Sequence, residues 1–339
     1  MNELILHETA LAMVAPGKGI LAADESTGTI EKRFKSVGVE NTESNRRAYR
    51  DLLFTAEGGQ QWISGVILFE ETLFQATRDG TPFPQYLASR GMVPGIKVDK
   101  GAKPLAGAPG ETVTEGLDGL RERLAKFKQI GTRFAKWRAV ITIGDGIPSD
   151  YCIGVNAHAL ARYAALCQEA DIVPIVEPEV LMDADNTIEV CENVTDRTLA
   201  AVFHELFTQR VLLEGMILKP NLVIAGKKNP WQADRKTVAE ATLRVLKRRV
   251  PAAVPGIAFL SGGQSDEDAT AHLDQIHKLG GGPWLLSFSY GRALQAAALK
   301  AWGGRAENVA AAQRAFLHRA RMNGLAASGR WESALEQAA

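Results

Sequence analysis

The sequence holds few cysteines and no excess of charge of either sign. Only 3 of its 339 residues are cysteine, at Cys152, Cys167 and Cys191, and no CxxC pair occurs. An odd number without that spacing predicts neither a disulfide framework nor a cysteine metal site. Lysine plus arginine number 39, as do aspartate plus glutamate, so the formal net charge is zero. We therefore expect no binding of nucleic acid or of a membrane surface, since both favour a basic excess.

Long apolar runs and several cofactor motifs are also missing. No run approaches the roughly 20 apolar residues of a transmembrane helix, and Glu3 and Glu8 replace the basic residues of a signal peptide. We expect a soluble, cytoplasmic protein. The absence of GxGxxG and GxxxxGK[ST] disfavours dinucleotide and P-loop sites. The 6 histidines show no HExxH spacing, so we expect no metal and no other cofactor.

Along the chain, short apolar runs alternate with stretches whose apolar residues have helical spacing. Buried parallel strands are predicted over residues 19–23, 64–69, 93–98, 134–141, 172–180, 216–223, 257–260 and 284–289. Helices are predicted over residues 3–15, 44–56, 115–130, 154–170, 195–213, 233–249, 265–277, 291–302 and 306–326. This alternation predicts a closed parallel (β/α)8 barrel, the TIM barrel, rather than an open sheet. We expect one domain over residues 1–339, with additional helices at its N-terminal and C-terminal ends.

Three of the predicted strands carry pairs of charged residues spaced two apart. These pairs are Lys97 with Asp99, Lys136 with Arg138, and Glu177 with Glu179. Residues two apart in a strand share a face, and charges facing the helix layer would be unpaired and costly. Barrel active sites lie at the C-terminal ends of the strands. We therefore expect the pairs to converge on one cavity there, together with Asp24 and Lys219.

Lys219 is the most unusual of these residues, because it follows the apolar run Gly215–Leu218. Lysine is rarely buried without a partner. Burial and a nearby cation such as Lys136 favour the neutral amine, which can attack a ketone and form a Schiff base. The alternative is an ordinary lysine at a strand end, with its ammonium group in water.

Two turns near the end of the chain indicate phosphate binding. Ser261-Gly262-Gly263 follows the seventh predicted strand, and Gly291-Arg292 follows the eighth; a helix begins after each. Helix N-termini bind anions, and these two loops form the usual phosphate site of a (β/α)8 barrel. A plain turn is the alternative for the first of them. We expect Lys97, with Ser26 and Thr29, to hold a second phosphate across the cavity.

Seven segments of the chain resemble class I fructose-bisphosphate aldolase. They span residues 19–28, 95–101, 135–138, 174–179, 218–221, 259–265 and 287–295. The resemblance covers nearly the whole chain. It implies a metal-independent lyase of glycolysis and gluconeogenesis that reversibly cleaves fructose 1,6-bisphosphate to dihydroxyacetone phosphate and glyceraldehyde 3-phosphate. It also implies a homo-oligomer, commonly a tetramer, whose small-molecule partner is the phosphorylated sugar.

The resemblance implies catalytic roles for five residues. Lys219 corresponds to the Schiff-base lysine, and Glu177 to the acid/base that drives dehydration of the carbinolamine. Asp24 corresponds to the group that assists cleavage of the carbon–carbon bond. Lys136 and Glu179 correspond to its electrostatic support.

The resemblance also implies two binding regions. One phosphate site corresponds to Ser261, Gly262, Gly263, Ser289, Gly291 and Arg292. The region for the other phosphate and the sugar hydroxyls corresponds to Ser26, Thr29, Arg33, Lys97 and Arg138, with Arg46 as an addition. Thr29 stands where many members carry serine and keeps the hydroxyl. Eukaryotic members end in a tyrosine that reaches the active site, whereas this chain has no tyrosine after Tyr290, so the sequence does not predict tail-assisted proton transfer.

Two other functions stay open at this point. One is a different Schiff-base barrel lyase that acts on another phosphorylated sugar. The other is a scaffold or binding protein that retains the fold. The complete set of Asp24, Lys136, Glu177 and Lys219 favours the aldolase over both. The relative preference for fructose 1,6-bisphosphate and fructose 1-phosphate does not follow from the sequence.

Overall fold

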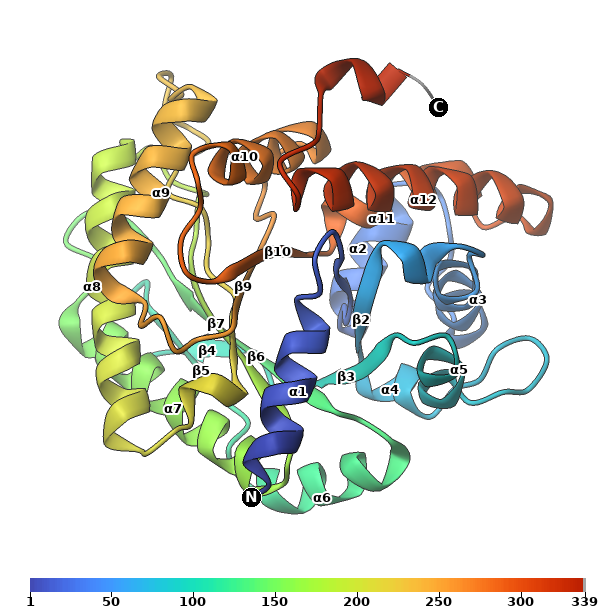
Figure 1. Cartoon of the computed structure of the whole chain (residues 1–339), viewed down its shortest axis with the longest axis horizontal. Helices are drawn as coiled ribbons and strands as arrows, with labels where there is room; N and C mark the ends of the chain where they lie inside the picture. The colour runs from blue at the N-terminus through green and yellow to red at the C-terminus, as the bar shows by residue number, and fades with distance from the viewer. Residues whose placement is uncertain (338–339) are drawn as a thin grey trace.

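The computed structural model describes residues 1–337, and its centre is a closed barrel of eight parallel strands (Figure 1). The strands are β1 (Gly19–Ala23), β2 (Ile63–Leu68), β3 (Val93–Lys97), β6 (Phe134–Ile141), β7 (Val173–Val180), β8 (Ile217–Leu218), β9 (Gly256–Phe259) and β10 (Leu285–Tyr290). Each pairs with its neighbour in the chain, and β1 pairs with β10 to close the ring. The predicted (β/α)8 barrel is therefore confirmed, and each predicted strand overlaps an observed one.

Helices surround the barrel. They are α1 (Glu3–Met13), α2 (Thr27–Lys35), α3 (Glu43–Phe54), α4 (Glu70–Leu73), α5 (Phe83–Ser89), α6 (Leu120–Ile130), α7 (Asp150–Glu169), α8 (Ile188–Thr208), α9 (Arg235–Arg249), α10 (Asp266–Lys278), α11 (Arg292–Trp302) and α12 (Val309–Ala326). Short 3-10 helices cover Gly59–Gln61, Leu213–Gly215, Ala306–Asn308 and Ser333–Gln337. None of the helices in this described part of the chain has the length and apolar character needed to span a bilayer.

Several elements were absent from the sequence prediction or were placed wrongly. The structure adds α2, α4, α5 and an antiparallel hairpin of β4 (Ala102–Pro104) and β5 (Thr112–Thr114). Helix α8 begins at Ile188 instead of residue 195, because the Thr187 hydroxyl accepts a hydrogen bond from the Val190 N–H and caps the earlier start. The missed elements are short, so their apolar periodicity is too brief to stand out.

The lower part of the barrel interior is apolar. Strand residues Ile67, Ile175 and Ile217 form one buried cluster with Leu6 and Met13 of α1. Helix α1 lies across the strands (Figure 1) and so covers this end of the barrel. The site must therefore open at the other end, where the strands finish.

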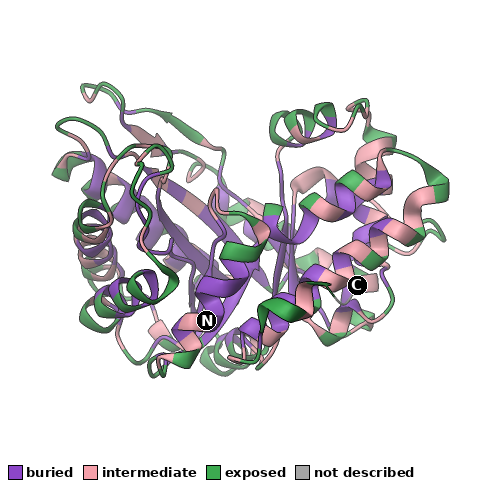
Figure 2. Ribbon diagram, turned by 90° about the horizontal axis from the view of Figure 1, so that it is seen from above, coloured by how far each residue is buried: buried purple, intermediate pink, exposed green. Residues whose placement is uncertain are grey.

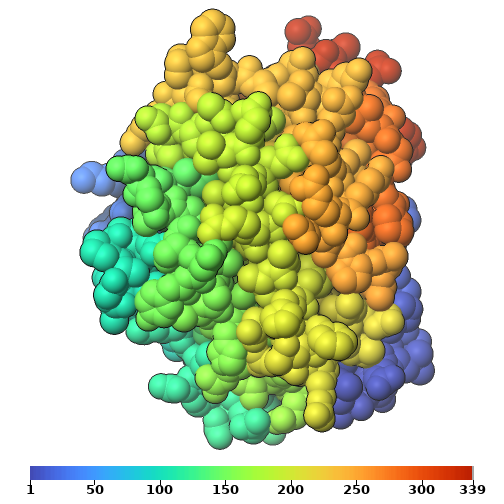
Figure 3. Space-filling model, turned by 90° about the vertical axis from the view of Figure 1, so that its left-hand side faces the viewer, coloured from blue at the N-terminus to red at the C-terminus, as the bar shows by residue number. Residues whose placement is uncertain are grey.

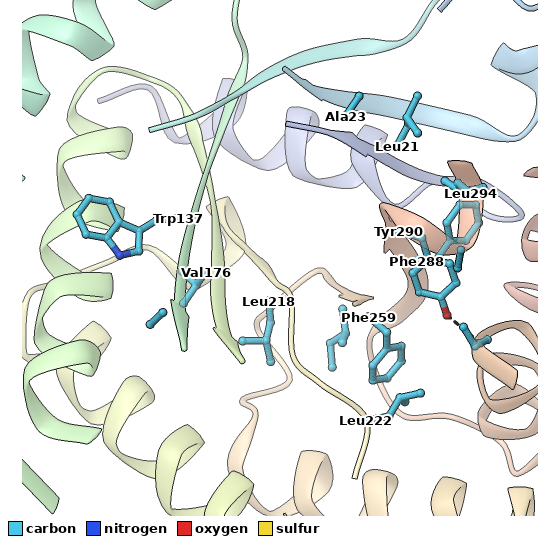
Figure 4. Packing of buried hydrophobic residues seen from close by; sticks show 14 of the residues in the cluster. Leu21, Ala23, Trp137, Val176, Leu218, Leu222, Phe259, Phe288, Tyr290 and Leu294 are labelled. Atoms are coloured by element: carbon cyan, nitrogen blue, oxygen red, sulfur yellow. Dashed lines mark hydrogen bonds between the residues drawn. The ribbon is translucent and has the colours of Figure 1, made fainter. Parts of the chain in front are cut away.

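A second apolar layer lies between the strands and the outer helices. Trp137 of β6 is fully buried, and its ring lies 5.5 Å from that of Tyr163 on α7. Figure 4 shows Trp137, Val176 and Leu218 within this layer, and the bond from the Tyr290 hydroxyl to the Ala269 carbonyl. Figure 2 shows buried strands at the centre and exposed outer faces on the helices. The alternate residues of these strands are consequently free to point into the barrel.

Ion pairs connect the outer helices. Helices α7, α8 and α9 pack side by side along one flank of the molecule (Figure 3). Glu192 of α8 accepts hydrogen bonds of 2.7 and 2.9 Å from Arg244 of α9. Near the end of the described chain, Glu336 accepts hydrogen bonds from Arg319 of α12 and from the Trp331 indole. The sequence does not predict a tail that assists proton transfer, because no tyrosine follows Tyr290. Two residues of that tail, Ala338 and Ala339, lie outside the described residues.

Candidate active site

A cavity of about 560 Å³ opens at the C-terminal ends of the barrel strands. It is lined by sixteen of the seventeen site residues predicted from the sequence. They are Asp24, Ser26, Thr29, Arg33, Lys97, Lys136, Arg138, Glu177, Glu179, Lys219, Ser261, Gly262, Gly263, Ser289, Gly291 and Arg292. Residues more than 260 positions apart in the chain thus share one chamber. The predicted convergence of the charged strand residues is observed.

Arg46 is the predicted site residue that does not line this cavity. It lies on α3, and its guanidinium forms hydrogen bonds of 2.8 and 2.7 Å with the Glu71 carboxylate. A third bond of 3.0 Å reaches the Asn41 side chain. Arg46 therefore has its own partners outside the chamber.

The strand register explains why the charged residues meet. Arg138 of β6 lies opposite Glu177 of β7, two positions beyond the pair of Lys136 with Ile175. The Lys219 N–H donates to the Val176 carbonyl at 2.8 Å, which continues the line of β8 beyond its last strand residue. Alternation then gives Lys219 the same inward direction as Ile217. On β7 and β8 the inward-facing residue changes from apolar to charged over two positions, from Ile175 to Glu177 and from Ile217 to Lys219.

Four of these residues form a charged quartet, defined here as Asp24, Lys136, Glu177 and Lys219. Lys136 Nζ lies 2.9 Å from Asp24 Oδ2 and 3.1 Å from Glu177 Oε2. Lys219 Nζ lies 3.2 Å from Glu177 Oε1. The four side chains are almost fully buried, with exposed fractions between 3% and 8%. Such burial makes the interactions among them much stronger than they would be in water.

The two lysines of the quartet respond to burial in opposite ways. Burial lowers the pKa of Lys219, the Lys136 cation lowers it further, and the attraction of Glu177 does not offset these effects. Burial also acts to lower the pKa of Lys136, but Asp24 and Glu177 outweigh it and raise that pKa well above its usual value. Lys136 is consequently a fixed cation, whereas Lys219 is the lysine whose neutral amine is accessible.

The two carboxylates of the quartet are held in their ionised forms. Burial alone would raise the pKa of Asp24, but Lys136, Lys219 and Lys97 together lower it well below its usual value. Burial likewise opposes ionisation of Glu177, while Lys136, Lys219 and Arg138 lower its pKa. The buried Oε2 of Glu177 lies 3.1 Å from Lys136 Nζ but accepts no well-aligned hydrogen bond within the described residues. It therefore keeps lone-pair capacity for a hydroxyl group or water molecule.

A second group of charges surrounds the mouth of the cavity. Arg138 donates a hydrogen bond to the Glu179 carboxylate. Lys97 Nζ lies 3.4 Å from Asp99 Oδ1, and the other oxygen of Asp99 accepts from the Arg138 N–H at 3.2 Å. Cations are thus held near the opening, where an anionic group of a ligand would enter.

On another wall of the cavity, the loop Ser261–Gly263 meets the start of α11. Gly262 has a positive φ of 57°, the left-handed conformation that glycine adopts most easily. The Arg292 guanidinium donates a hydrogen bond to the Gly262 carbonyl. The Ser289 hydroxyl is buried and has no hydrogen-bond partner within residues 1–337. An unpaired buried hydroxyl beside a cation and a glycine turn is well suited to a phosphate oxygen.

Glu25 is a structural partner of the site that the sequence prediction left out. Its carboxylate accepts hydrogen bonds of 2.8 Å from Arg50 and 2.9 Å from Gln295, and a third from Arg33. Gln295 also donates to the Ala22 carbonyl at 2.7 Å. Glu25 therefore joins the end of β1 to α2, α3 and α11. Its only signal in the sequence is its place between Asp24 and Ser26.

The described residues contain no group of three or more histidine, cysteine, aspartate or glutamate side chains placed to hold a metal ion. His272 lies apart from the charged quartet, and its Nδ1 is 2.6 Å from the Gln264 side chain. The polar side chains that line the chamber are instead those of lysines, arginines, carboxylates and hydroxyl residues.

The buried lysine at the C-terminal end of the barrel, with carboxylates and cations around it, is an arrangement typical of (β/α)8 barrel enzymes. Comparison with known families then gives a narrower result. A sequence model of the family Glycolytic, described as fructose-bisphosphate aldolase class-I, matches residues 5–339. The chain belongs to this family, whose members are lyases.

Relatives match the chain over most of its length. The protein named "Probable fructose-bisphosphate aldolase class 1" from Xanthomonas campestris pv. campestris is 62% identical over 328 residues, covering 96% of this chain and 98% of the relative. "Fructose-bisphosphate aldolase 4, cytosolic" from Arabidopsis thaliana is 57% identical over 315 residues, covering 93% and 80%. A crystal structure of the Plasmodium falciparum aldolase, solved with TRAP and a small-molecule inhibitor, has a TM-score of 0.96. That aldolase is 50% identical, with coverage of 98% of this chain and 96% of the other.

Proposed function

We propose that this chain is a class I aldolase that reversibly cleaves fructose 1,6-bisphosphate to dihydroxyacetone phosphate and glyceraldehyde 3-phosphate, in glycolysis and gluconeogenesis. Family membership supports the reaction. The observation that carries the chemistry is the buried amine of Lys219, 3.2 Å from the Glu177 carboxylate and close to a second, permanently charged lysine. This arrangement favours a neutral, nucleophilic Lys219.

The first stage joins the sugar to the protein. The neutral amine of Lys219 attacks the ketone carbon C2, a C–N bond forms, and the electron pair of the C=O π bond moves to the oxygen, which takes a proton from solvent water to become the hydroxyl of a carbinolamine. Glu177 takes a proton from the nitrogen and returns one to the hydroxyl, which leaves as water. The product is a protonated iminium ion. Glu177 suits both transfers, because its Oε1 lies 3.2 Å from Lys219 Nζ, while its Oε2, 3.1 Å from Lys136 Nζ, keeps lone-pair capacity for the leaving hydroxyl.

The second stage breaks the C3–C4 bond. The iminium accepts the electron pair of that bond and becomes an enamine, while Asp24 receives the proton of the C4 hydroxyl. Glyceraldehyde 3-phosphate leaves. Protonation of the enamine at C3 and hydrolysis of the iminium release dihydroxyacetone phosphate and restore Lys219. Lys136, 2.9 Å from Asp24, keeps that carboxylate ionised so that it can act as a base. Glu179 accepts a hydrogen bond from Arg138 and so orients that cation beside the charged quartet.

The two phosphate groups occupy opposite walls in this proposal. One binds the loop Ser261–Gly263, with Ser289 and the Gly291-Arg292 helix start. The other binds the cations Lys97 and Arg138 near the mouth, where the hydroxyls of Ser26 and Thr29 lie 3.1 Å apart. Arg33 lies between the two regions: its guanidinium approaches Gly291 and is oriented by Glu25. A substrate with a phosphate at each end is thereby fixed with its ketone at Lys219.

We also propose a single domain over residues 1–339, a cytoplasmic location and a homotetramer. Two Arabidopsis thaliana relatives carry the word cytosolic in their names, which supports the location. The resemblance to class I aldolases supports the tetramer.

A coupled assay tests the proposed function. The purified chain is expected to release dihydroxyacetone phosphate and glyceraldehyde 3-phosphate in equal amounts from fructose 1,6-bisphosphate. A parallel assay with fructose 1-phosphate gives the relative preference. Cleavage of a different phosphorylated sugar in place of both would indicate another Schiff-base lyase. No cleavage of any of these sugars by the folded chain would indicate a binding protein.

A further inference from the structure

Lys227 lies against the phosphate-binding loop, although neither the sequence motifs nor the proposed mechanism includes it. A Cβ atom built on Gly263 would lie only 1.7 Å from Lys227 Nζ and 2.1 Å from its Cε. The end of the lysine therefore fills the space that any side chain at position 263 would need. The absence of a side chain at Gly263 is what admits this cation to the loop.

The backbone around Lys227 is fixed by the neighbouring loop. The Lys227 N–H donates to the Met182 carbonyl at 2.7 Å, and the Lys228 N–H donates to the Ala184 carbonyl at 3.0 Å. At Gly226, a Cβ would lie 2.2 Å from the Ala184 carbonyl oxygen, so a larger residue would not fit. The segment after β8 is thus attached to the segment after β7. This attachment holds the start of the Lys227 side chain beside the phosphate loop.

The loop carries weak interactions that an anion can replace. The Gly263 N–H donates to the Met182 thioether sulfur at 2.9 Å, and a thioether is a weak acceptor. Lys227 pairs with Asp183, whose Oδ1 lies 3.5 Å from Nζ and whose side chain is 69% exposed. An exposed pair at this distance contributes little to stability. Lys227 and the Gly263 N–H are consequently both available to a stronger acceptor.

Arg292 contacts the same loop through its bond to the Gly262 carbonyl. Arg292 lines the main cavity and Lys227 lines a neighbouring one, and Gly263 lines both. The loop therefore contacts two cations, one from the start of α11 and one from the segment after β8. A phosphate monoester carries close to two negative charges at neutral pH. Two cations with backbone N–H donors between them match that charge, and charge-assisted hydrogen bonds to phosphate are among the stronger ones.

We propose that Lys227 is a second cationic ligand of the phosphate bound at Ser261–Gly263, and that Asp183 competes for it when the site is empty. This inference rests on the proposed function, because it assigns a further specificity-determining residue to the same site. Lys227 moves from the Asp183 carboxylate to the phosphate when substrate binds. It strengthens binding of the substrate and its transition state alike, without taking part in the bond-breaking steps.

The test compares three variants in steady-state cleavage of fructose 1,6-bisphosphate. Lys227→Gln is expected to raise KM about fivefold and to leave kcat within about twofold, the pattern for loss of uniform binding. Lys228→Gln is the matched control, since Lys228 is the next residue and is also exposed; its KM is expected to equal that of the wild type. Asp183→Asn removes the competitor and is expected to lower KM, opposite in sign to Lys227→Gln.

Inorganic phosphate provides a second readout that does not depend on turnover. Its dissociation constant, measured by calorimetry, is expected to rise by a similar factor in Lys227→Gln and to stay unchanged in Lys228→Gln. Lys227→Arg is expected to keep most of the affinity. The difference between wild type and Lys227→Gln should shrink at high salt, because the interaction is electrostatic and exposed.

Equal KM and equal phosphate affinity for Lys227→Gln and Lys228→Gln would overturn the role of Lys227, while cleavage by both variants would leave the proposed function intact. A rise in KM for Asp183→Asn would overturn the competition. If the wild-type chain cleaves neither sugar, the proposed function fails. The phosphate affinities of the two lysine variants then still decide whether Lys227 belongs to the anion site.

Discussion

Lys219 Nζ lies 3.2 Å from one carboxylate oxygen of Glu177. The other oxygen of that carboxylate lies 3.1 Å from Lys136 Nζ, so one anion separates two buried lysines. Their pKa values nevertheless move in opposite directions, because Lys136 also contacts Asp24 whereas Lys219 does not. This difference assigns the nucleophile and the fixed cation to two residues of the same type.

Replacement of Glu177 by glutamine is expected to slow the reaction strongly. The amide keeps the shape of the side chain but neither accepts nor returns a proton at neutral pH, so loss of water from the carbinolamine becomes slow. We expect kcat to fall by roughly 10²- to 10⁴-fold, the usual contribution of a general acid/base. Steady-state assays give kcat, and borohydride trapping over time gives the rate of iminium formation. Glu169→Gln, on the surface of α7, is the control; iminium formation at the wild-type rate in Glu177→Gln would contradict the role of Glu177.

Replacement of Lys219 by methionine is expected to abolish activity and to stabilise the fold near neutral pH. Burial lowers the pKa of Lys219 in the folded state, so the unfolded chain binds this proton more readily. Stability therefore rises with pH from the lowered pKa up to the usual value near 10.5. Removing the amine eliminates the free-energy cost of burying a group that is charged in the unfolded chain. The free energy of unfolding is therefore expected to rise by about 1–2 kcal/mol at pH 7.

Urea unfolding between pH 7 and pH 10 measures this effect. The gain of Lys219→Met over wild type should decrease as the pH rises toward the usual lysine pKa. The exposed Lys228→Met serves as the control and should show no such trend. A gain that is independent of pH, or a gain that grows as the pH rises, would contradict the lowered pKa of Lys219.

Replacement of Arg292 by alanine separates phosphate binding from chemistry. Arg292 contributes charge to the loop Ser261–Gly263 but lies outside the charged quartet. We expect KM for fructose 1,6-bisphosphate to rise at least tenfold, while borohydride still traps the iminium at saturating substrate. Arg305→Ala, at an exposed position just beyond the end of α11, is the control. An unchanged KM in Arg292→Ala would place the phosphate elsewhere.

Removal of metal ions tests the lysine chemistry in another way. Prolonged treatment with a chelator, followed by gel filtration, is expected to leave full activity, because the proposed electron sink is the iminium. The activity before and after treatment is the measurement. A loss of activity that added zinc restores would contradict the Schiff-base mechanism.

Much of the fold and the site follows from strand periodicity in the sequence. Each strand of the barrel has one face toward the helices and one toward the interior, so its apolar run is continuous and easily detected. The interruptions of these runs by Lys136, Glu177 and Lys219 then identify the charged end of the interior. Parallel strands bring these ends together, which is why residues from different strands could be assigned to one cavity.

The parts that the sequence did not predict depend on contacts between distant segments. Arg46 resembles a ligand residue in the sequence, but its orientation is decided by Glu71, which follows another strand. Glu25 owes its position to Arg50 and Gln295, which are far apart in the chain. Lys227 is next to the phosphate loop only because two backbone hydrogen bonds join separate loops. No local pattern of residues records such pairings.

Identification of the lysine that forms the Schiff base tests the central claim most directly. Borohydride, added in the presence of dihydroxyacetone phosphate, reduces the iminium and fixes the substrate to the protein. Peptide mapping is expected to find the adduct on Lys219 alone, although Lys97 and Lys136 line the same cavity. Lys219→Ala is expected to lose both the adduct and cleavage. An adduct on Lys136 or Lys97 in the wild type, or normal turnover by Lys219→Ala, would contradict the mechanism.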